Sequence, residues 1–242
     1  MVALVLNKGY NNLEQACTKG KEVFWMISQA DSNKPIFKNF HQKITTPQGR
    51  VVIAGPILPE ELEGLTLDAG LRAFRPPERQ HRALVEIAGM EKGQIFAAVF
   101  ERTIVGYISF HPPDKFERWG QANIPELIEL GGMETSPAWR GLKLSSAVLK
   151  AAFANSRFAE NIVIATEYCW HWDLKGTGLP VYKYRQMMEK LLGKVGLYPL
   201  GTDDPEVCSH PANMFSVRVG SKVSSETFIA FEAIRYLNKN II

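Results

Sequence analysis

Residues 126–153 read ELIELGGMETSPAWRGLKLSSAVLKAAF, and the other predicted elements are arranged around this stretch. Its first half has the apolar alternation of a strand and ends at Ser136-Pro137, because proline cannot donate to a sheet ladder. Its second half, from Leu144 onward, has apolar residues at helical spacing. The turn between them, residues 140–145, leaves unpaired N–H groups at the positive end of a helix dipole. The stretch therefore predicts a strand–turn–helix unit that binds phosphate.

Two features of the predicted strand bear on chemistry. Gly131-Gly132 weakens the strand, so we expect a bulge or a close approach of the backbone to a ligand at this point. Side chains alternate between the two faces of a strand. By this period, Glu129 shares a face with Met133 and Thr135, whereas Glu134 lies on the other face.

Composition excludes several classes of protein. The chain has 242 residues, 45% of them hydrophobic and 22% charged, which is typical of a globular protein. A net charge of +3 without a basic run argues against a nucleic-acid partner. Three cysteines do not make a disulfide framework, so we expect a reducing, cytoplasmic setting. No apolar run approaches the length of a transmembrane helix, so no membrane partner is expected.

The remaining elements follow from turn residues and periodicity. Strands are predicted at 50–54, 94–100, 104–110, 161–166, 197–202 and 215–219, and helices at 59–62, 77–88, 180–192 and 224–240. These elements suggest an N-terminal extension (1–43), one α/β domain (44–220) and a C-terminal helix (221–242). The extension is expected to pack on the core or on a partner.

Arg140-Gly141 before a helix, just after a strand ending in Thr135-x-Pro137, resembles the acetyl-CoA-binding turn of the GCN5-related N-acetyltransferases (GNAT). Longer strings resemble the bacterial acetoin-utilisation branch of this family, whose members acetylate protein lysines: FRPPERQHRALVEIAG (74–89), RTIVGY (102–107), LIELGGMETSPAWRG (127–141), TEYCWHWDLKG (166–176) and DDPEVCSHPAN (203–213). The resemblance implies the GNAT fold, a mixed twisted sheet with flanking helices and a splayed central strand pair. It also implies acetyl-CoA as cosubstrate, no metal, and AMP-forming acetyl-CoA synthetase as the protein that is acetylated and inactivated.

The resemblance also implies positions for the donor. The pantetheine arm is expected beside the backbone of Met133, Glu134 and Thr135. The pyrophosphate is expected at the turn formed by Arg140, Gly141, Leu142, Lys143, Leu144 and Ser145. Lys143 stands where the family has glycine, and its Cβ predicts a negative φ at that position.

Acid–base chemistry is expected from carboxylates on the strand. A lysine amine, with a pKa of about 10.4, is protonated at neutral pH and must lose a proton before it attacks. Glu129 occupies the place of the base in the histone-acetylating branch, and Glu134 is the second candidate. The family's tyrosine, a general acid for the thiolate, is replaced here by Leu192. Tyr168 and His171 are substitutes by their location after the strand 161–166.

Two alternatives to catalysis on a protein remain open. The first is a regulator that binds acetyl-CoA or CoA and inhibits the synthetase without catalysis, and the second is an acetyltransferase for a small amine. Two Cys-x-His pairs, Cys169/His171 and Cys208/His210, raise a zinc site as a further alternative, although this is not a usual zinc spacing. The sequence leaves the oligomeric state undetermined.

Overall fold

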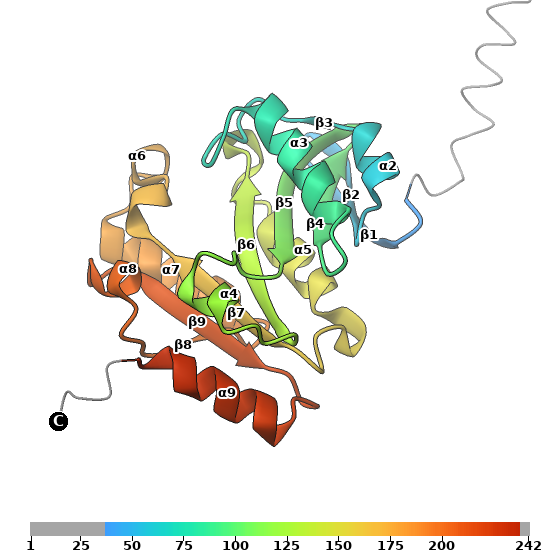
Figure 1. Ribbon diagram of the computed structural model, residues 1–242. Coiled ribbons are helices and arrows are strands. Elements are labelled where there is room, and N and C mark those ends of the chain that lie inside the picture. Colours follow the sequence, from blue (N-terminus) through green and yellow to red (C-terminus); the bar gives the residue numbers. More distant parts are fainter. Residues whose placement is uncertain (1–36, 238–242) are drawn as a thin grey trace, which may run out of the picture. The chain divides into compact units, whose positions relative to one another are not determined.

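The computed structural model describes residues 37–237, and the account of the fold refers to these residues (Figure 1). The sheet order is β1-β2-β4-β5-β6-β7-β9-β8, and β3 pairs with β5 outside this path. The strands are β1 (Phe40–Thr46), β2 (Gly49–Ala54), β3 (Thr66–Leu67), β4 (Gln94–Phe100), β5 (Thr103–His111), β6 (Leu127–Thr135), β7 (Ile162–Glu167), β8 (Tyr198–Pro199) and β9 (Met214–Val219). Neighbours are antiparallel except β6/β7 and β3/β5, which are parallel.

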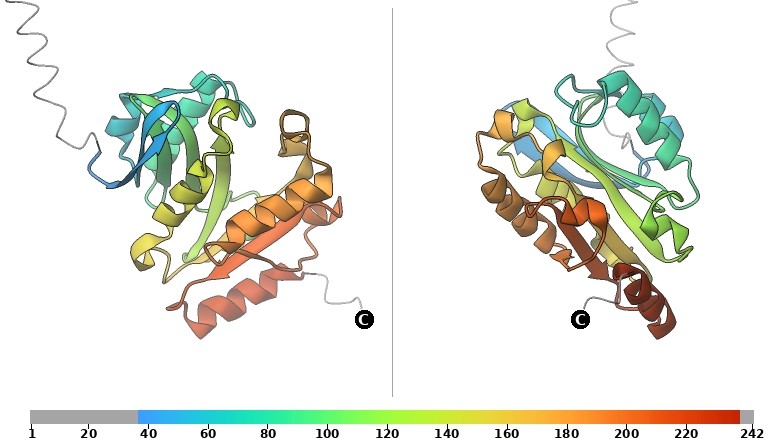
Figure 2. Two further views of the ribbon diagram at one scale, coloured as in Figure 1. Left: turned by 180° about the vertical axis from the view of Figure 1, so that it is seen from behind. Right: turned by 60° about the vertical axis from the view of Figure 1, so that its left-hand side comes forward.

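Helices cover both faces of the sheet (Figure 2). One face packs against α5 (Leu144–Ala152) and α7 (Val181–Gly193) in the largest apolar cluster. The other face packs against α2 (Pro59–Glu63) and α3 (Pro77–Ala88) in its first half, and against α4 (Arg118–Gln121) and α9 (Ser225–Arg235) in its second half. Two short helices lie in connections: α6 (Leu174–Thr177) between β7 and α7, and α8 (Pro205–Cys208) between β8 and β9.

The parallel strands β6 and β7 separate after a short paired region. Their register runs from Leu127↔Ile162 to Glu129↔Ile164, and no pair beyond Glu129 joins them among the described residues. β6 itself continues to Thr135, paired on its other side with β5. The edge of β6 that faces β7 is therefore open from Leu130 onward, and Figure 1 shows the two strands diverging.

A β-bulge at Gly131 changes which side chains of β6 share a face. Ser109 pairs with Gly132 and Phe110 with Leu130, which leaves Gly131 as the extra residue. A Cβ at Gly131 would lie 1.9 Å from Nε2 of His111, so the ring occupies the space that any side chain there would need. The prediction of a bulge in this glycine pair is confirmed.

The predicted assignment of faces was wrong because of this extra residue. Residues directly opposed in an antiparallel pair share a face. Glu129 is opposed to His111 and Glu134 to Tyr107, two positions that lie on the same face of β5. Both carboxylates therefore lie on the face of α3 and α4, whereas Met133 packs against the cluster of α5 and α7. Strict alternation along β6 would place Glu129 and Met133 on the same face.

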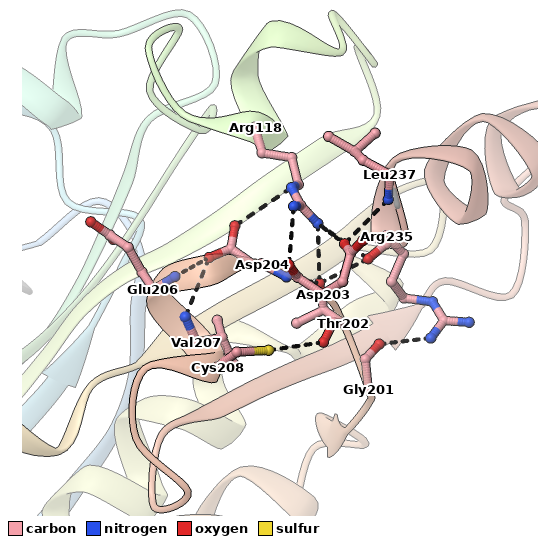
Figure 3. A network of polar contacts seen from close by, with 10 residues as sticks. All are labelled: Arg118, Gly201, Thr202, Asp203, Asp204, Glu206, Val207, Cys208, Arg235 and Leu237. Atoms are coloured by element: carbon pink, nitrogen blue, oxygen red, sulfur yellow. Dashed lines mark hydrogen bonds and ion pairs between the residues drawn. The ribbon is translucent and has the colours of Figure 1, made fainter. Parts of the chain in front are cut away.

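A buried ion-pair network joins α4 to the C-terminal part of the domain (Figure 3). The guanidinium of Arg118 contacts the carboxylate of Asp203, lies 3.7 Å from the carboxylate of Asp204, and donates to the carbonyl of Arg235 at 3.3 Å. Asp204 also caps α8 through the N–H groups of Glu206 and Val207. The network thereby fixes the segment that follows β5 against the loop before α8.

The predicted elements agree with the structure except at the edges of the domain. The hairpin β4/β5, the strand–turn–helix unit and α7 lie where the pattern placed them. β1 begins at Phe40, inside the expected extension, and pairs with β2; residues 1–36 lie outside the described residues. The strand expected at 197–202 is reduced to Tyr198–Pro199. In the part of the chain that the structure describes, no helix is long and apolar enough to cross a membrane.

Candidate active site

A cleft of about 1180 Å³ lies where β6 and β7 diverge. Its walls are the open edge of β6, the turn before α5, the connection after β7, and α7. All of the predicted site residues line it except Leu142, whose side chain packs against the core: Glu129, Met133, Glu134, Thr135, Arg140, Gly141, Lys143, Leu144, Ser145, Tyr168 and His171. The structure therefore gathers the predicted residues around one cavity.

The turn before α5 has the backbone of an anion-binding turn. Lys143 is the N-cap residue, with φ 61° and ψ 16°, and no side chain caps the first N–H groups of the helix. The expected negative φ at Lys143 was therefore wrong, because the turn imposes the left-handed conformation even without glycine. The hydroxyls of Thr135 and Ser145 lie 2.8 Å apart and join the end of β6 to the first turn of α5.

We expect Lys143→Gly to stabilise the fold. The left-handed conformation costs a residue with a Cβ about 1–2 kcal/mol, and glycine adopts it freely. A rise of about 1 kcal/mol in the free energy of unfolding should appear in denaturant titrations of Lys143→Gly and not of Lys143→Ala, which keeps the Cβ.

The same two variants test the ammonium of Lys143 as a phosphate contact. Loss of one exposed charge contact of about 1 kcal/mol raises the dissociation constant of CoA about fivefold. We expect this rise in both variants, measured by calorimetry. An unchanged affinity would exclude the contact.

Arg140 does not point freely into the cleft. Its Nη1 donates to Oδ2 of Asp173 at 2.6 Å, and its Nε to the carbonyl of Thr135 at 3.4 Å. Asp173 caps α6 through the N–H of Gly176, and the Arg140 guanidinium lowers its pKa. Arg140 thus holds the connection after β7 against the end of β6, a role that the sequence did not predict.

Glu129 is a buried carboxyl with one hydrogen-bond donor from the neighbouring strand. Its side chain is on the α3/α4 face, 8% of the residue is exposed, and Thr166 donates to its Oε1 at 3.1 Å. Burial raises its pKa to about 7, with a further contribution from the negative charge of Asp114. Near neutral pH the group can accept a proton and release it again, as a general base must.

Glu134 is held by three donors. The backbone N–H groups of Arg72 and Ala73 donate to its Oε1 at 2.7 and 2.8 Å, and the hydroxyl of Tyr107 donates to Oε2 at 3.2 Å. Burial raises its pKa, and the three hydrogen bonds oppose that rise. These contacts fix the loop before α3 at the cleft, and they occupy three of the about four lone-pair sites of the carboxylate.

Tyr168 and His171 form an aromatic rim on the same side as Glu129. Tyr168 stacks on Trp170 with ring centroids 4.8 Å apart, and His171 meets the edge of Phe74 at 5.9 Å. Burial, followed by the negative charge of Glu206, raises the pKa of Tyr168. Tyr168 is two positions after Thr166, the partner of Glu129, and therefore shares its face, whereas His171 contacts Phe74 in the loop before α3.

Among the further polar residues that line the cleft, the sequence reasoning missed a group of titratable side chains that bears on the chemistry: His111, Asp114, Glu117 and Glu167. His111 ends β5, and Asp114 and Glu117 follow it in the proline-rich loop, where no periodicity indicates direction. Glu167 ends β7, and alternation along IVIATE would have placed it opposite Thr166. Burial and nearby carboxylates, Glu129 first among them, raise the pKa of Glu117 to about 7.

The zinc alternative finds no support in the geometry. Within residues 37–237, no group of three or more His, Cys, Asp or Glu side chains could hold a metal ion. Cys208 instead donates to the carbonyl of Thr202 at 3.3 Å, and His210 accepts the N–H of Ala212 at 3.0 Å.

Comparison with known proteins gives one family and several close relatives. Residues 65–169 match the acetyltransferase (GNAT) family. The acetoin utilization protein AcuA of Bacillus licheniformis is 45% identical over 203 residues, which are 84% of this chain and 97% of the relative. AcuA of Bacillus subtilis is 43% identical over 203 residues, again 84% of this chain and 97% of the relative. A crystal structure of an acetoin utilization protein from Exiguobacterium sibiricum superposes with a TM-score of 0.81 at 40% identity, covering 83% of this chain and 96% of that one.

Proposed function

Since the chain belongs to the acetyltransferase (GNAT) family, as one of its acetoin utilization proteins, and uses acetyl-CoA, we propose that it acetylates a lysine side chain on a protein. The proposed acceptor is AMP-forming acetyl-CoA synthetase, which acetylation would inactivate. One observation carries the proposal of catalysis. The buried carboxyl of Glu129 lies at the point where β6 and β7 separate, on the face opposite α5 and α7.

The residues present fit acetyl-CoA. The uncapped N–H groups at the start of α5, with Arg140 and Lys143 beside them, provide donors and positive charge for the pyrophosphate. The open edge of β6 beyond Glu129 offers backbone groups to the amides of the pantetheine arm. Acetyl-CoA supplies the activated acetyl group. An N–H from Met133 or a neighbour on this edge would stabilise the oxyanion.

The acceptor would approach from the other face. Asp114 and Glu117 line the cleft near Glu129 and attract an ammonium group. Glu129 takes the proton that the amine loses on attack. Exposed aromatic side chains next in sequence to lining residues, Trp170 before His171 at 55% exposure and Phe116 before Glu117 at 79%, suit a polypeptide acceptor with apolar contacts around its lysine.

The first experiment is the intact mass of AMP-forming acetyl-CoA synthetase, from the same organism, after incubation with this protein and acetyl-CoA. We expect a gain of one acetyl group and loss of synthetase activity, and neither with Glu129→Gln. Inhibition without a mass change, retained in Glu129→Gln, would instead favour a regulator that binds the synthetase. No change in mass or activity, with acetylation of free amines intact, would favour a small-amine acetyltransferase.

A further inference from the structure

The acyl donor and the acceptor amine, as proposed above, lie on opposite faces of the sheet at the β6/β7 cleft. On the face from which the amine approaches, Glu129 is the proposed base. The departing sulfur would lie toward α5 and α7, on the face opposite to the one that Tyr168 shares with Thr166 and Glu129. A proton donor for the thiolate must therefore come from that second face.

Glu167 is an acidic residue that faces this side of the cleft. It is opposed to Met214 on β9, and Met214 packs in the cluster of α5 and α7. Val163 and Ala165, which share the face of Glu167 because they lie four and two positions before it along β7, belong to the same cluster. Glu167 also lines the cleft, unlike the other two. The strand thus presents Thr166 to Glu129 on one face and Glu167 to the donor on the other.

The surroundings of Glu167 hold its carboxyl in place and favour its protonated form. Trp172 Nε1 donates to its Oε2 at 3.1 Å, and the Trp172 ring stacks on Tyr184 of α7 with centroids 5.1 Å apart. Burial raises the pKa of Glu167 to about 7, although the Trp172 hydrogen bond opposes this. Tyr184 is influenced by the charges of Arg140, Glu167 and Asp173, and Arg140 and Asp173 pair with each other.

We propose that Glu167 is the general acid of the reaction and protonates the CoA sulfur as the thiolate departs. This inference rests on the proposed acetyl transfer to an amine. The N–C bond forms as the amine attacks the thioester carbon, and Glu129 accepts a proton from the nitrogen. The C–S bond then breaks with its electron pair on sulfur, which takes the carboxyl proton of Glu167. Glu129 ends protonated and Glu167 ionised, and exchange with water restores both.

The test is Glu167→Gln, which retains the shape of the side chain and an acceptor for Trp172. Turnover should be followed over pH 5.5–9.5 with any amine that the wild type acetylates. Because the acid works in its protonated form, wild-type turnover should fall as pH rises above about 7. In Glu167→Gln we expect turnover at pH 7 to drop about a hundredfold and the alkaline fall to disappear. The dissociation constant of acetyl-CoA should not change.

Companion variants separate catalysis from structure. Glu167→Asp should recover part of the turnover and the alkaline fall, because a carboxyl is present again. Glu160→Gln, on an exposed side chain paired only loosely with Lys222, should behave like the wild type. If Tyr184→Phe loses the alkaline fall and Glu167→Gln keeps it, the acid is Tyr184 and the proposal is wrong.

Two further outcomes would also overturn it. A Glu167→Gln enzyme with wild-type turnover at every pH would exclude this carboxyl while leaving amine acetylation intact. A wild-type enzyme that acetylates no amine would refute the proposed function, and the assignment of Glu167 with it.

Discussion

Glu129→Gln should reduce turnover by a factor of about 10²–10⁴, the usual contribution of a positioned general base. The substitution keeps the size of the side chain and an oxygen that accepts from Thr166. It removes the group that takes up the proton. The base acts as a carboxylate, and the pKa of Glu129 is raised to about 7. Wild-type kcat/KM should therefore rise with pH up to about 7, before the alkaline fall assigned to Glu167, and this rise should be absent from the variant.

Two other carboxylates make controls for this experiment. Glu117, whose pKa is also raised to about 7, interacts with Glu129 through charge. In Glu117→Gln the loss of that negative charge should move the rise in kcat/KM to lower pH without abolishing it. Glu126→Gln, before the start of β6, should leave the profile unchanged. Nearly full turnover of Glu129→Gln across the pH range would contradict the assignment.

Arg118→Met should lower the free energy of unfolding by about 3–5 kcal/mol, the usual cost of removing one partner from a buried ion pair. Only 11% of the Arg118 side chain is exposed, against 16% for Asp203 and 12% for Asp204. Methionine retains most of the packing of the aliphatic stem but leaves both carboxylates without the guanidinium (Figure 3). Denaturant unfolding followed by circular dichroism measures the change.

Lys222→Met is the matched control for the Arg118 experiment. The Lys222–Glu160 pair spans 3.9 Å, and its side chains are 67% and 76% exposed. Such exposed pairs contribute about 0–1 kcal/mol, so this variant should unfold close to the wild type. A loss of less than about 1 kcal/mol in Arg118→Met would mean that solvent reaches the two aspartates once the arginine is gone.

The central part of the fold was predictable because each element there has a local signal. Pro137 marks the end of β6, the Gly131-Gly132 pair marks the bulge, and the apolar spacing from Leu144 marks α5. The turn and the carboxylate at the strand separation follow from these signals together with the family resemblance. The pattern therefore found the residues that line one side of the cleft.

The remainder depends on contacts between segments far apart in the chain. Arg140 pairs with Asp173, and the backbone N–H of Arg72 donates to the Glu134 carboxylate. Neither contact produces a periodic pattern in the sequence from which it could be predicted. The positive φ of Lys143 was also unpredictable, because a lysine adopts it only when the surrounding turn compensates its cost. Tertiary contacts of this kind decide which carboxylate stays available for chemistry.

The bulge in β6 also limits how this strand can change in evolution. Glu129 and Glu134 are five positions apart, an odd spacing that would separate them across the sheet in a regular strand. Deletion of Gly131 alone would place one of the two carboxylates on the opposite face of the sheet, which packs against α5 and α7. A surface loop tolerates insertions and deletions of any size, but this strand could lengthen or shorten between the two glutamates only by two residues at a time. An alignment of distant relatives that opens a one-residue gap here would exchange the two sides of the active site.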